Sequence, residues 1–212
     1  TEIGVGAFWN NKLTNVILGN SITTIGSAAF RDNQLTGIII PDSVTEIGVG
    51  AFWNNKLTNV ILGNSITTIG DSAFMINQLT NIIIPDSVTT IDSSAFQNNQ
   101  LTSVIIPNSV TTIGYGAFES NNLNYVLINS GSKLTSIGLA AFSSSNSTST
   151  SDGIVYVDNP NLKIYNNSGK AFDWNNAVNS SRGTTFVTGT TNVKTSGSTT
   201  YNAVTVTTGQ PS

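Results

Sequence analysis

The chain is built from one motif that recurs every 22 residues, and this period constrains the fold more than any other feature. The stretch from Leu101 to Phe118, LTSVIIPNSVTTIGYGAF, shows the motif. Its last residue recurs at Phe8, Phe30, Phe52, Phe74, Phe96 and Phe118. A fixed period of about 20 to 50 residues is the signature of a solenoid, in which stacked coils share one continuous core.

The repeats predict one solenoid over residues 1–142. Six coils run to Phe118, and a seventh ends at Phe142, 24 residues later, because of an insertion around INSGSKLTS. Residues 1–26 recur without change at 45–70, which indicates duplication of a unit of two coils. The chain opens inside a coil, at TEIGVGAF, so we expect it to be an excerpt of a longer protein.

The first half of each coil is expected to form a short β-strand. Leu101, Val104 and Ile106 fit a strand with these side chains directed inward. Pro107 stops the strand because it has no N–H to donate to a β-ladder. The tripeptide that follows, PNS here and PDS or GNS in other coils, is typical of a turn.

The second half of each coil is expected to return the chain to its starting point. Val110 and Ile113 are placed inward on another short extended piece. Gly114 is expected to permit an unusual backbone angle. Ala117 and Phe118 are expected to close the coil as a single turn of 3₁₀-helix. Each coil then supplies about six apolar side chains to the core, and neighbouring coils lie about 5 Å apart.

An asparagine occurs two residues before each repeated leucine. The members are Asn11, Asn33, Asn55, Asn77, Asn99 and Asn121. We interpret these amides as structural groups that satisfy backbone atoms of adjacent coils, because unpaired buried polar groups are costly. A binding role for them would require that they are exposed.

The repeat pattern, L-T-x-V-x-I-P-x-S-V-T-x-I-G-x-x-A-F-x-x-N-x, closely resembles the BspA-like leucine-rich repeats of bacterial surface proteins over residues 1–142. The resemblance implies a mostly β, curved solenoid with a parallel sheet on its concave side. It also implies an extracellular or cell-surface location and an adhesin-type binding function, and it carries no catalytic residues. Asp92, which replaces the usual Gly, is one of the minor departures from the pattern.

Three segments follow the solenoid. Residues 143–152, SSSNSTSTSD, are expected to form a polar loop. Residues 153–182, with a strand at 154–157 and a short helix at 170–178, are predicted to be a C-terminal cap over the open sheet edge. Residues 183–212 are rich in Thr and Gly and are expected to be strands or a stalk.

Composition excludes several classes of function. The 11 acidic and 8 basic residues form no basic stripe, which argues against nucleic-acid binding. No run of about 18 apolar residues is present, so no membrane insertion of this segment is expected. The absence of Cys and His removes thiol chemistry, disulfides, common zinc sites and His-based triads. No acidic ligand set repeats along the coils, and no metal or cofactor is predicted.

The outward positions of the first strand are the main candidate for a binding surface. One of them carries Ile or Leu in six coils, and another is mostly small or polar. The predicted binding residues are Asn15, Ile17, Ile39, Asn59, Ile61, Asn81, Ile83, Ile105, Tyr125 and Leu127. An exposed apolar stripe of this length usually marks a contact surface. The alternatives are the β-propensity of Ile, or burial between curved coils.

Two other repeated features are weaker candidates. An S-x-T array forms a hydroxyl grid that could bind carbohydrate or ice, although Ser and Thr also cap turns. Its members are Ser21, Ser43, Ser65, Ser87 and Ser109 with Thr23, Thr45, Thr67, Thr89 and Thr111. The position after each Phe varies, with Trp9, Arg31, Trp53, Met75, Gln97 and Glu119, and its Trp residues could stack on sugars.

An enzyme is not expected. Asp42 and Asp86 have the same phase two coils apart, hence about 10 Å apart. That is close to the separation in an inverting glycosidase, but both stand in P-D-S turns, where Asp is a favoured residue. The sequence therefore favours a non-catalytic extracellular module that binds a protein or glycan. The alternatives are a rigid spacer in a larger surface protein, or a carbohydrate- or ice-binding surface. The oligomeric state stays open.

Overall fold

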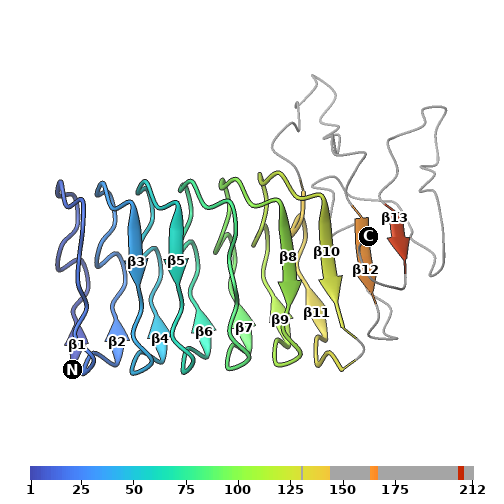
Figure 1. Cartoon of the computed structure of the whole chain (residues 1–212), viewed down its shortest axis with the longest axis horizontal. Coiled ribbons are helices and arrows are strands. Elements are labelled where there is room, and N and C mark those ends of the chain that lie inside the picture. Colours follow the sequence, from blue (N-terminus) through green and yellow to red (C-terminus); the bar gives the residue numbers. More distant parts are fainter. Residues whose placement is uncertain (130, 144–162, 167–204, 208–212) are drawn as a thin grey trace, which may run out of the picture.

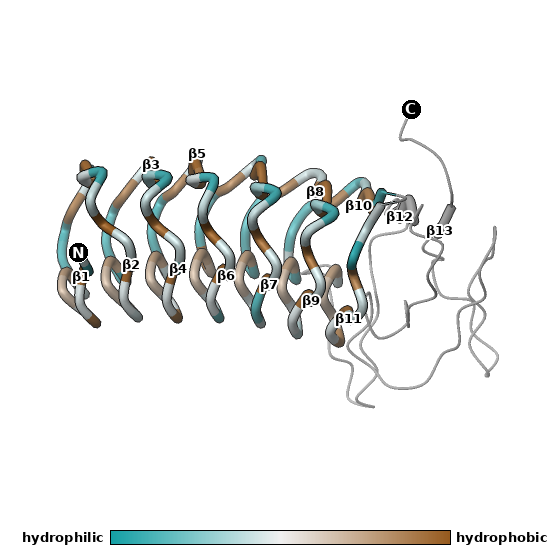
Figure 2. Tube along the Cα trace, turned by 90° about the horizontal axis from the view of Figure 1, so that it is seen from below, coloured by the Kyte–Doolittle hydropathy of each residue, from teal (hydrophilic) through white to brown (hydrophobic). Residues whose placement is uncertain are grey.

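The computed structural model describes residues 1–129 and 131–143, together with two strands at 163–166 and 205–207. Over these residues the chain forms a β-solenoid of coils stacked along a nearly straight line, with no helix (Figure 1). Hydrophobic segments recur at the same place in successive coils (Figure 2). The predicted fold, a mostly β solenoid of 22-residue coils with parallel strands, is confirmed. The curvature that the resemblance implied is slight in these two views.

The continuous sheet lies on the second extended piece of each coil. Its strands are β1 (Glu2–Ile3), β2 (Thr24–Ile25), β4 (Glu46–Ile47), β6 (Thr68–Ile69), β7 (Thr90–Ile91), β9 (Thr112–Ile113) and β11 (Ser136–Ile137). All neighbours in this seven-stranded sheet pair in parallel. The isoleucines face the core, and the residues before them face outward.

The first piece of the coil forms two shorter sheets on another side of the stack. One contains β3 (Gly37–Ile39) and β5 (Asn59–Ile61). The other, in the order β13-β12-β10-β8, contains β8 (Ser103–Ile106), β10 (Tyr125–Ile128), β12 (Lys163–Asn166) and β13 (Thr205–Thr207). We refer to the outward side of these strands and of the equivalent segments 15–18 and 81–84 as the strand face.

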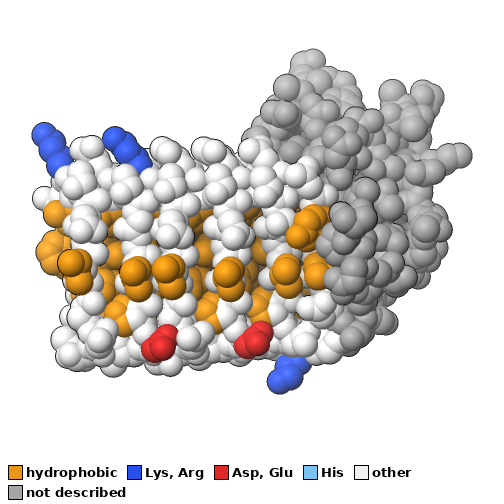
Figure 3. All heavy atoms as spheres, in the orientation of Figure 1, with side chains coloured by type: hydrophobic (Ala, Val, Ile, Leu, Met, Phe, Trp, Pro, Cys, Tyr) orange, Lys and Arg blue, Asp and Glu red, His pale blue; other side chains and the backbone are white. Residues whose placement is uncertain are grey.

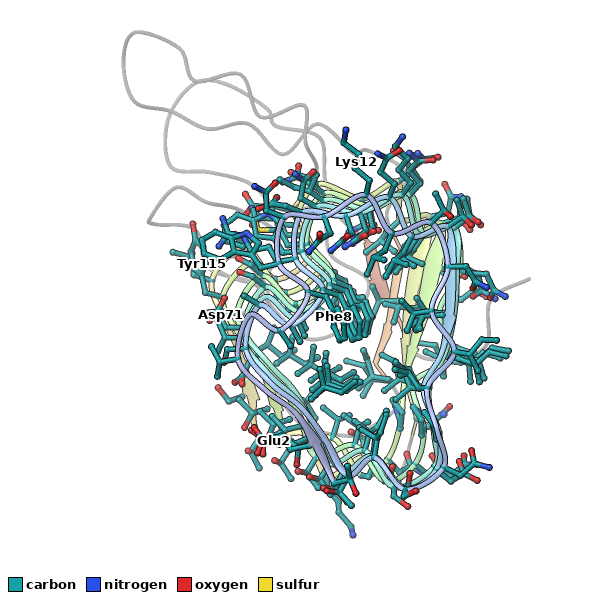
Figure 4. The ribbon with its side chains drawn as sticks, turned by 90° about the vertical axis from the view of Figure 1, so that its left-hand side faces the viewer. Glu2, Phe8, Lys12, Asp71 and Tyr115 are labelled. Atoms are coloured by element: carbon teal, nitrogen blue, oxygen red, sulfur yellow. The ribbon has the colours of Figure 1, made fainter. Side chains whose placement is uncertain are left out.

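The core is organised around a column of phenylalanine rings. Consecutive rings from Phe8 to Phe142 are stacked with centroids 5.2–5.6 Å apart and planes within 12° of parallel. Figure 4 looks down the stack and shows Phe8 inside the coil at the front of this column. The ring spacing is close to the distance between neighbouring strands, so backbone pairing and ring stacking impose the same rise per coil.

The coil closes differently from the predicted 3₁₀ turn. Two successive turns follow Ile113, in which Ala117 donates to the Gly114 carbonyl and Glu119 donates to the Gly116 carbonyl. The left-handed residue between them is Gly116, with φ of 56°, and this angle interrupts a 3₁₀-helix. The prediction that Gly114 supplies the unusual angle is therefore wrong. Gly114 instead avoids a close approach, because a Cβ there would lie 2.4 Å from the backbone nitrogen of Ser93 unless the neighbouring coil shifted.

The insertion in the seventh coil does not disturb the stack. Ser136 pairs with Thr112, 24 residues earlier, and the ring of Phe142 still stacks on Phe118 at 5.6 Å. β12 and β13 lie in the segments predicted as the cap and as the Thr/Gly-rich strand or stalk. The predicted strand at 154–157, the helix at 170–178 and most of the polar loop lie outside the described residues.

We predict that Phe74→Ala lowers the free energy of unfolding by about 3–5 kcal/mol, because it leaves a ring-sized cavity between two stacked neighbours. The matched control is Phe8→Ala, since Phe8 stacks on Phe30 alone and its side chain is 44% exposed. Denaturant titration followed by circular dichroism measures both. Equal losses for the two variants would contradict a continuous ring column as the main source of core stability.

Candidate binding surface

The strand face carries a row of exposed isoleucines. Ile17, Ile39, Ile61, Ile83 and Ile105 are between 51% and 90% exposed. The inward residues on either side of them are largely buried, as the pleat of a strand requires. Figure 3 shows a row of hydrophobic side chains that crosses this face from coil to coil. The sequence prediction for these five residues is confirmed as to their exposure, while their role in binding is not tested by the structure.

The predicted surface ends sooner than expected at its C-terminal side. Leu127 was predicted to be exposed, but it is 5% exposed, and Tyr125 is only partly exposed. β10 is the last strand of the regular repeats, and the chain continues the sheet into β12, where Tyr165 is the register partner of Leu127. Leu127 is thus buried although it has the phase of the exposed isoleucines, and the exposed row runs from Ile17 to Ile105.

Small polar residues and charges frame the isoleucine row. Asn15, Asn59 and Asn81 are exposed beside it, as predicted. Lys12 and Lys56 precede the strands of the first and third coils, whereas Asp42 and Asp86 follow the strands of the second and fourth. Because parallel strands begin at one edge of a sheet and end at the other, these two lysines and these two aspartates lie on opposite edges of the strand face; Figure 3 shows two basic side chains at the upper edge, and two acidic side chains with a further basic one at the lower edge.

Most of the hydroxyl grid is engaged with the backbone, although the Ser109 hydroxyl is buried without a hydrogen-bond partner. Each threonine from Thr45 to Thr111 donates its Oγ1 hydrogen to the carbonyl of the equivalent threonine one coil earlier, at 3.1–3.3 Å. Ser43 and Ser87 likewise donate to the carbonyls of Ile22 and Ile66, both at 2.6 Å. These hydroxyls link successive coils, which favours the structural interpretation of the array.

The asparagine ladder is also structural, as predicted, except at its first member. Asn77 is buried, and its Nδ2 donates to the carbonyls of Phe52 and Phe74 at 3.0 and 3.1 Å. Its Oδ1 accepts from the Leu57 N–H at 3.0 Å. The same three bonds recur at Asn33, Asn55, Asn99 and Asn121. Asn11 is exposed and donates to the Trp9 carbonyl.

The variable position after each Phe forms a stack that the sequence did not reveal. The guanidinium of Arg31 lies 3.9 Å from the ring centroid of Trp53 and 5.6 Å from that of Trp9. Asp32 ties the stack together, because it accepts from Trp9 Nε1 at 2.9 Å, Asn54 Nδ2 at 2.7 Å and Arg31 Nε at 3.2 Å. The alternation of Trp and Arg in successive coils was the available signal.

This stack weakens the idea that the tryptophans bind sugars. A sugar stacks on the face of an aromatic ring, and Arg31 occupies the facing sides of both Trp9 and Trp53. Burial raises the pKa of Asp32, but its hydrogen bonds from Asn54 and Trp9 and the charge of Arg31 outweigh burial, so the net pKa is below its ordinary value. The arrangement is that of an anchored carboxylate in a structural cluster.

One departure from the repeat places a partly buried charge where neighbouring coils have glycine. Asp92 occupies the position where neighbouring coils have Gly70 and Gly114, and a Cβ on Gly70 would lie 2.6 Å from the carbonyl oxygen of Ile47. The backbone bond of this position survives, since the Asp92 N–H donates to the Ile69 carbonyl at 2.9 Å. Partial burial, and next the negative charge of Asp71, raise the pKa of the Asp92 carboxyl.

The repeat pattern and the coil geometry agree with a family match. The description "BspA type Leucine rich repeat region" matches residues 1–124, 77–168 and 99–186, with six copies. The chain belongs to the BspA-type leucine-rich repeat family. The resemblance predicted from the sequence is therefore confirmed.

Solved structures to which this BspA-type chain is similar include two bacterial proteins. One is a leucine-rich repeat protein from Bacteroides ovatus ATCC 8483, with 21% identity and a TM-score of 0.49 over 79% of this chain and 47% of that one. Another is a leucine-rich cell surface protein from Faecalibacterium prausnitzii A2-165, with 27% identity and a TM-score of 0.43 over 74% and 51%. The chain thus spans about half the length of these proteins. No curated protein matches it.

The described residues offer little for chemistry. Among them, no three Asp, Glu, His or Cys side chains are grouped so that they could hold a metal ion. Asp42, one of the two carboxylates considered for catalysis, accepts from the Asn64 N–H at 2.7 Å. The described part of the chain also contains no helix that is long and apolar enough to cross a membrane. That the chain is not an enzyme stays a prediction.

We predict that Asn77→Ala lowers the free energy of unfolding by about 2–4 kcal/mol, because it leaves the Leu57 N–H and two carbonyls buried without a partner. Asn11→Ala is the matched control, because Asn11 is exposed, and we expect a change below about 0.5 kcal/mol. Chemical denaturation of both variants measures the difference. A small loss for Asn77→Ala would show that the ladder is not needed to join the coils.

We predict that Asp92→Asn stabilises the fold at pH 7. The pKa of Asp92 is raised in the folded state, so the folded chain binds a proton more readily than the unfolded chain. The stability of the wild type therefore falls as the pH rises from the unfolded pKa of Asp92 through its folded pKa. The variant removes that loss, and its advantage should disappear below about pH 3, where the carboxyl is protonated in both states.

Thermal unfolding of the wild type and Asp92→Asn from pH 3 to pH 7 tests this prediction. Asp71→Asn should give a smaller gain of the same sign, because it removes only the neighbouring charge. Parallel pH profiles for the wild type and Asp92→Asn would rule out the raised pKa.

Proposed function

We propose that the chain is a non-catalytic protein-binding module of an extracellular bacterial surface protein, and that it contacts its partner in adhesin fashion through the strand face. The observation that carries this proposal is the exposed isoleucine row from Ile17 to Ile105. Membership in a family of bacterial surface repeat proteins supports both the location and the binding role.

The seven-stranded sheet shows that β-propensity alone does not explain the isoleucine row. The outward positions of the seven-stranded sheet are Glu2, Thr24, Glu46, Thr68, Thr90, Thr112 and Ser136. Threonine is as suitable for a strand as isoleucine, and it keeps a polar group in water. Isoleucine at the outward position of the strand face therefore goes beyond what a strand needs, and an exposed apolar row of this length favours a contact surface.

A rigid spacer is the second candidate function, and the ring column favours it. Stacked rings and the asparagine ladder link each coil to the next over the whole described solenoid. Such a rod would hold a binding domain away from the cell surface. The spacer hypothesis gives no reason for the isoleucine row, which is why we rank it second. Carbohydrate or ice binding ranks lower, because the grid hydroxyls bond to the backbone.

We predict that Ile61→Lys/Ile83→Lys abolishes partner binding and leaves the fold intact, because both side chains point outward and two buried charges would oppose docking. The measurement is a binding screen against extracellular matrix proteins and a glycan array, with circular dichroism to verify folding. Thr67→Lys/Thr89→Lys, on another side of the same coils, is the control that should retain binding.

A protein hit that is lost only in the isoleucine variant supports the proposal. A hit that is indifferent to both variants would move the site to another side of the coil. Binding of glycans alone, lost in the threonine variant, would replace the proposal by the carbohydrate alternative.

A further inference from the structure

The spacing of the isoleucine row restricts what can fill it. One isoleucine projects from each coil, and the coils are about 5 Å apart, so five side chains span about 20 Å. A partner that contacts every member of the row must offer apolar groups at the same interval along a straight line. The partner is therefore defined by its period as well as by its hydrophobicity.

Common recognition elements do not match this period. An α-helix presents a side chain to one face about every 5.4 Å, and over four intervals it falls out of step by about 2 Å. An extended peptide presents one about every 6.8 Å, and over the same four intervals the mismatch grows to about 7 Å. The face of a β-sheet does match it, because neighbouring strands are about 4.8 Å apart, and a second stack of parallel coils keeps this interval over its whole length.

The charges at the edges of the strand face select one orientation for such a pair. Lys12, Asp42, Lys56 and Asp86 come from the first, second, third and fourth coils in turn. Two strand faces can meet with the coils of both copies stacked in the same direction, related by a twofold axis parallel to that direction. The lysine edge of each copy then lies opposite the aspartate edge of the other. If the stacks run in opposite directions, lysines face lysines and aspartates face aspartates.

We propose that the partner of the strand face is a second copy of this chain. The two solenoids lie parallel, with their isoleucine rows packed against each other and their charged edges paired. The proposal deepens the function proposed above and rests on its choice of surface. Sheets that pack face to face lie about 10 Å apart, which leaves room for the two rows to interdigitate.

The size of the contact predicts weak association. A face about 20 Å long and about 20 Å wide buries about 400 Å² per copy, or about 800 Å² in total, below the usual range of about 1,200–2,000 Å² for stable complexes. The pair should therefore form at high local concentration, as on a crowded surface, and be mostly dissociated in dilute solution. A longer stack of coils would add equivalent isoleucine contacts and so strengthen the association of the two copies.

Sedimentation equilibrium of the chain from micromolar to millimolar concentration tests the pairing. We expect a reversible monomer–dimer equilibrium that Ile61→Lys/Ile83→Lys weakens at least tenfold and Thr67→Lys/Thr89→Lys leaves within twofold. A monomer at all concentrations would overturn the proposal. Self-association that survives in the isoleucine variant would also overturn it, since that result assigns the contact to another surface, such as the exposed end around Phe8.

Charge reversal tests the orientation. Lys12→Glu/Lys56→Glu has two acidic edges, and Asp42→Lys/Asp86→Lys has two basic edges, so each variant alone should dimerise at least fivefold more weakly than the wild type. Mixed in equal amounts, the two should restore association as a heterodimer. Circular dichroism is needed to check that the variants fold, because Asp42→Lys removes the acceptor for the Asn64 N–H. Failure of the mixture to restore association would overturn the parallel arrangement.

The two proposals can fail separately. A chain that binds a foreign protein through the isoleucine row but stays monomeric would refute self-pairing and leave the proposed function in place. A chain that dimerises through the row and binds nothing else in the screen would support self-pairing and refute binding to a foreign partner.

Discussion

The structure depends on the requirement that every coil repeats its neighbour at the rise of a parallel β-sheet. Two side chains enforce this requirement in each coil. The Phe ring stacks on the next ring at 5.2–5.6 Å, and the Asn amide bonds to backbone groups of its own coil and of earlier coils. Because both contacts act at the spacing of the backbone ladder, ring packing and polar satisfaction support one another instead of competing.

This repetition has a consequence for the surface. A residue that points outward in one coil points outward in the next. A residue type that recurs at one position of the repeat therefore forms a row whose members are about 5 Å apart. The chain uses this property in three ways. The threonines donate hydrogen bonds to the preceding coil, Trp9, Arg31 and Trp53 stack on one another, and the isoleucine row stays exposed. Of these three rows, the isoleucine row is the one whose members are all left exposed in the described part of the chain.

Much of this could be predicted from the sequence because the period carries the information. The inward Phe, the buried Asn and the outward Ile each follow from phase within the repeat, and the structure agrees for Phe74, Asn77 and Ile61. Prediction failed where phase is not enough. The left-handed angle at Gly116 rather than Gly114 depends on local turn geometry, and Leu127 is buried although its phase in the repeat is that of the exposed isoleucines.

The candidate site was likewise predictable only where phase within the repeat determines it. Phase alone predicted the exposed row. The alternation of Trp and Arg hinted at the Arg31 stack, but the stack also depends on side-chain rotamers that the alternation does not determine, and it changed the interpretation of the tryptophans. The charges on the strand face show what a strict repeat leaves free to vary. Position by position, Lys12 and Lys56 alternate with glutamine at one edge, while Asp42 and Asp86 alternate with asparagine at the other. Substitutions between an amide and a charge of similar size cost the fold little at exposed turns. Such positions can therefore set the choice and orientation of a partner, while Phe and Asn hold the coil unchanged.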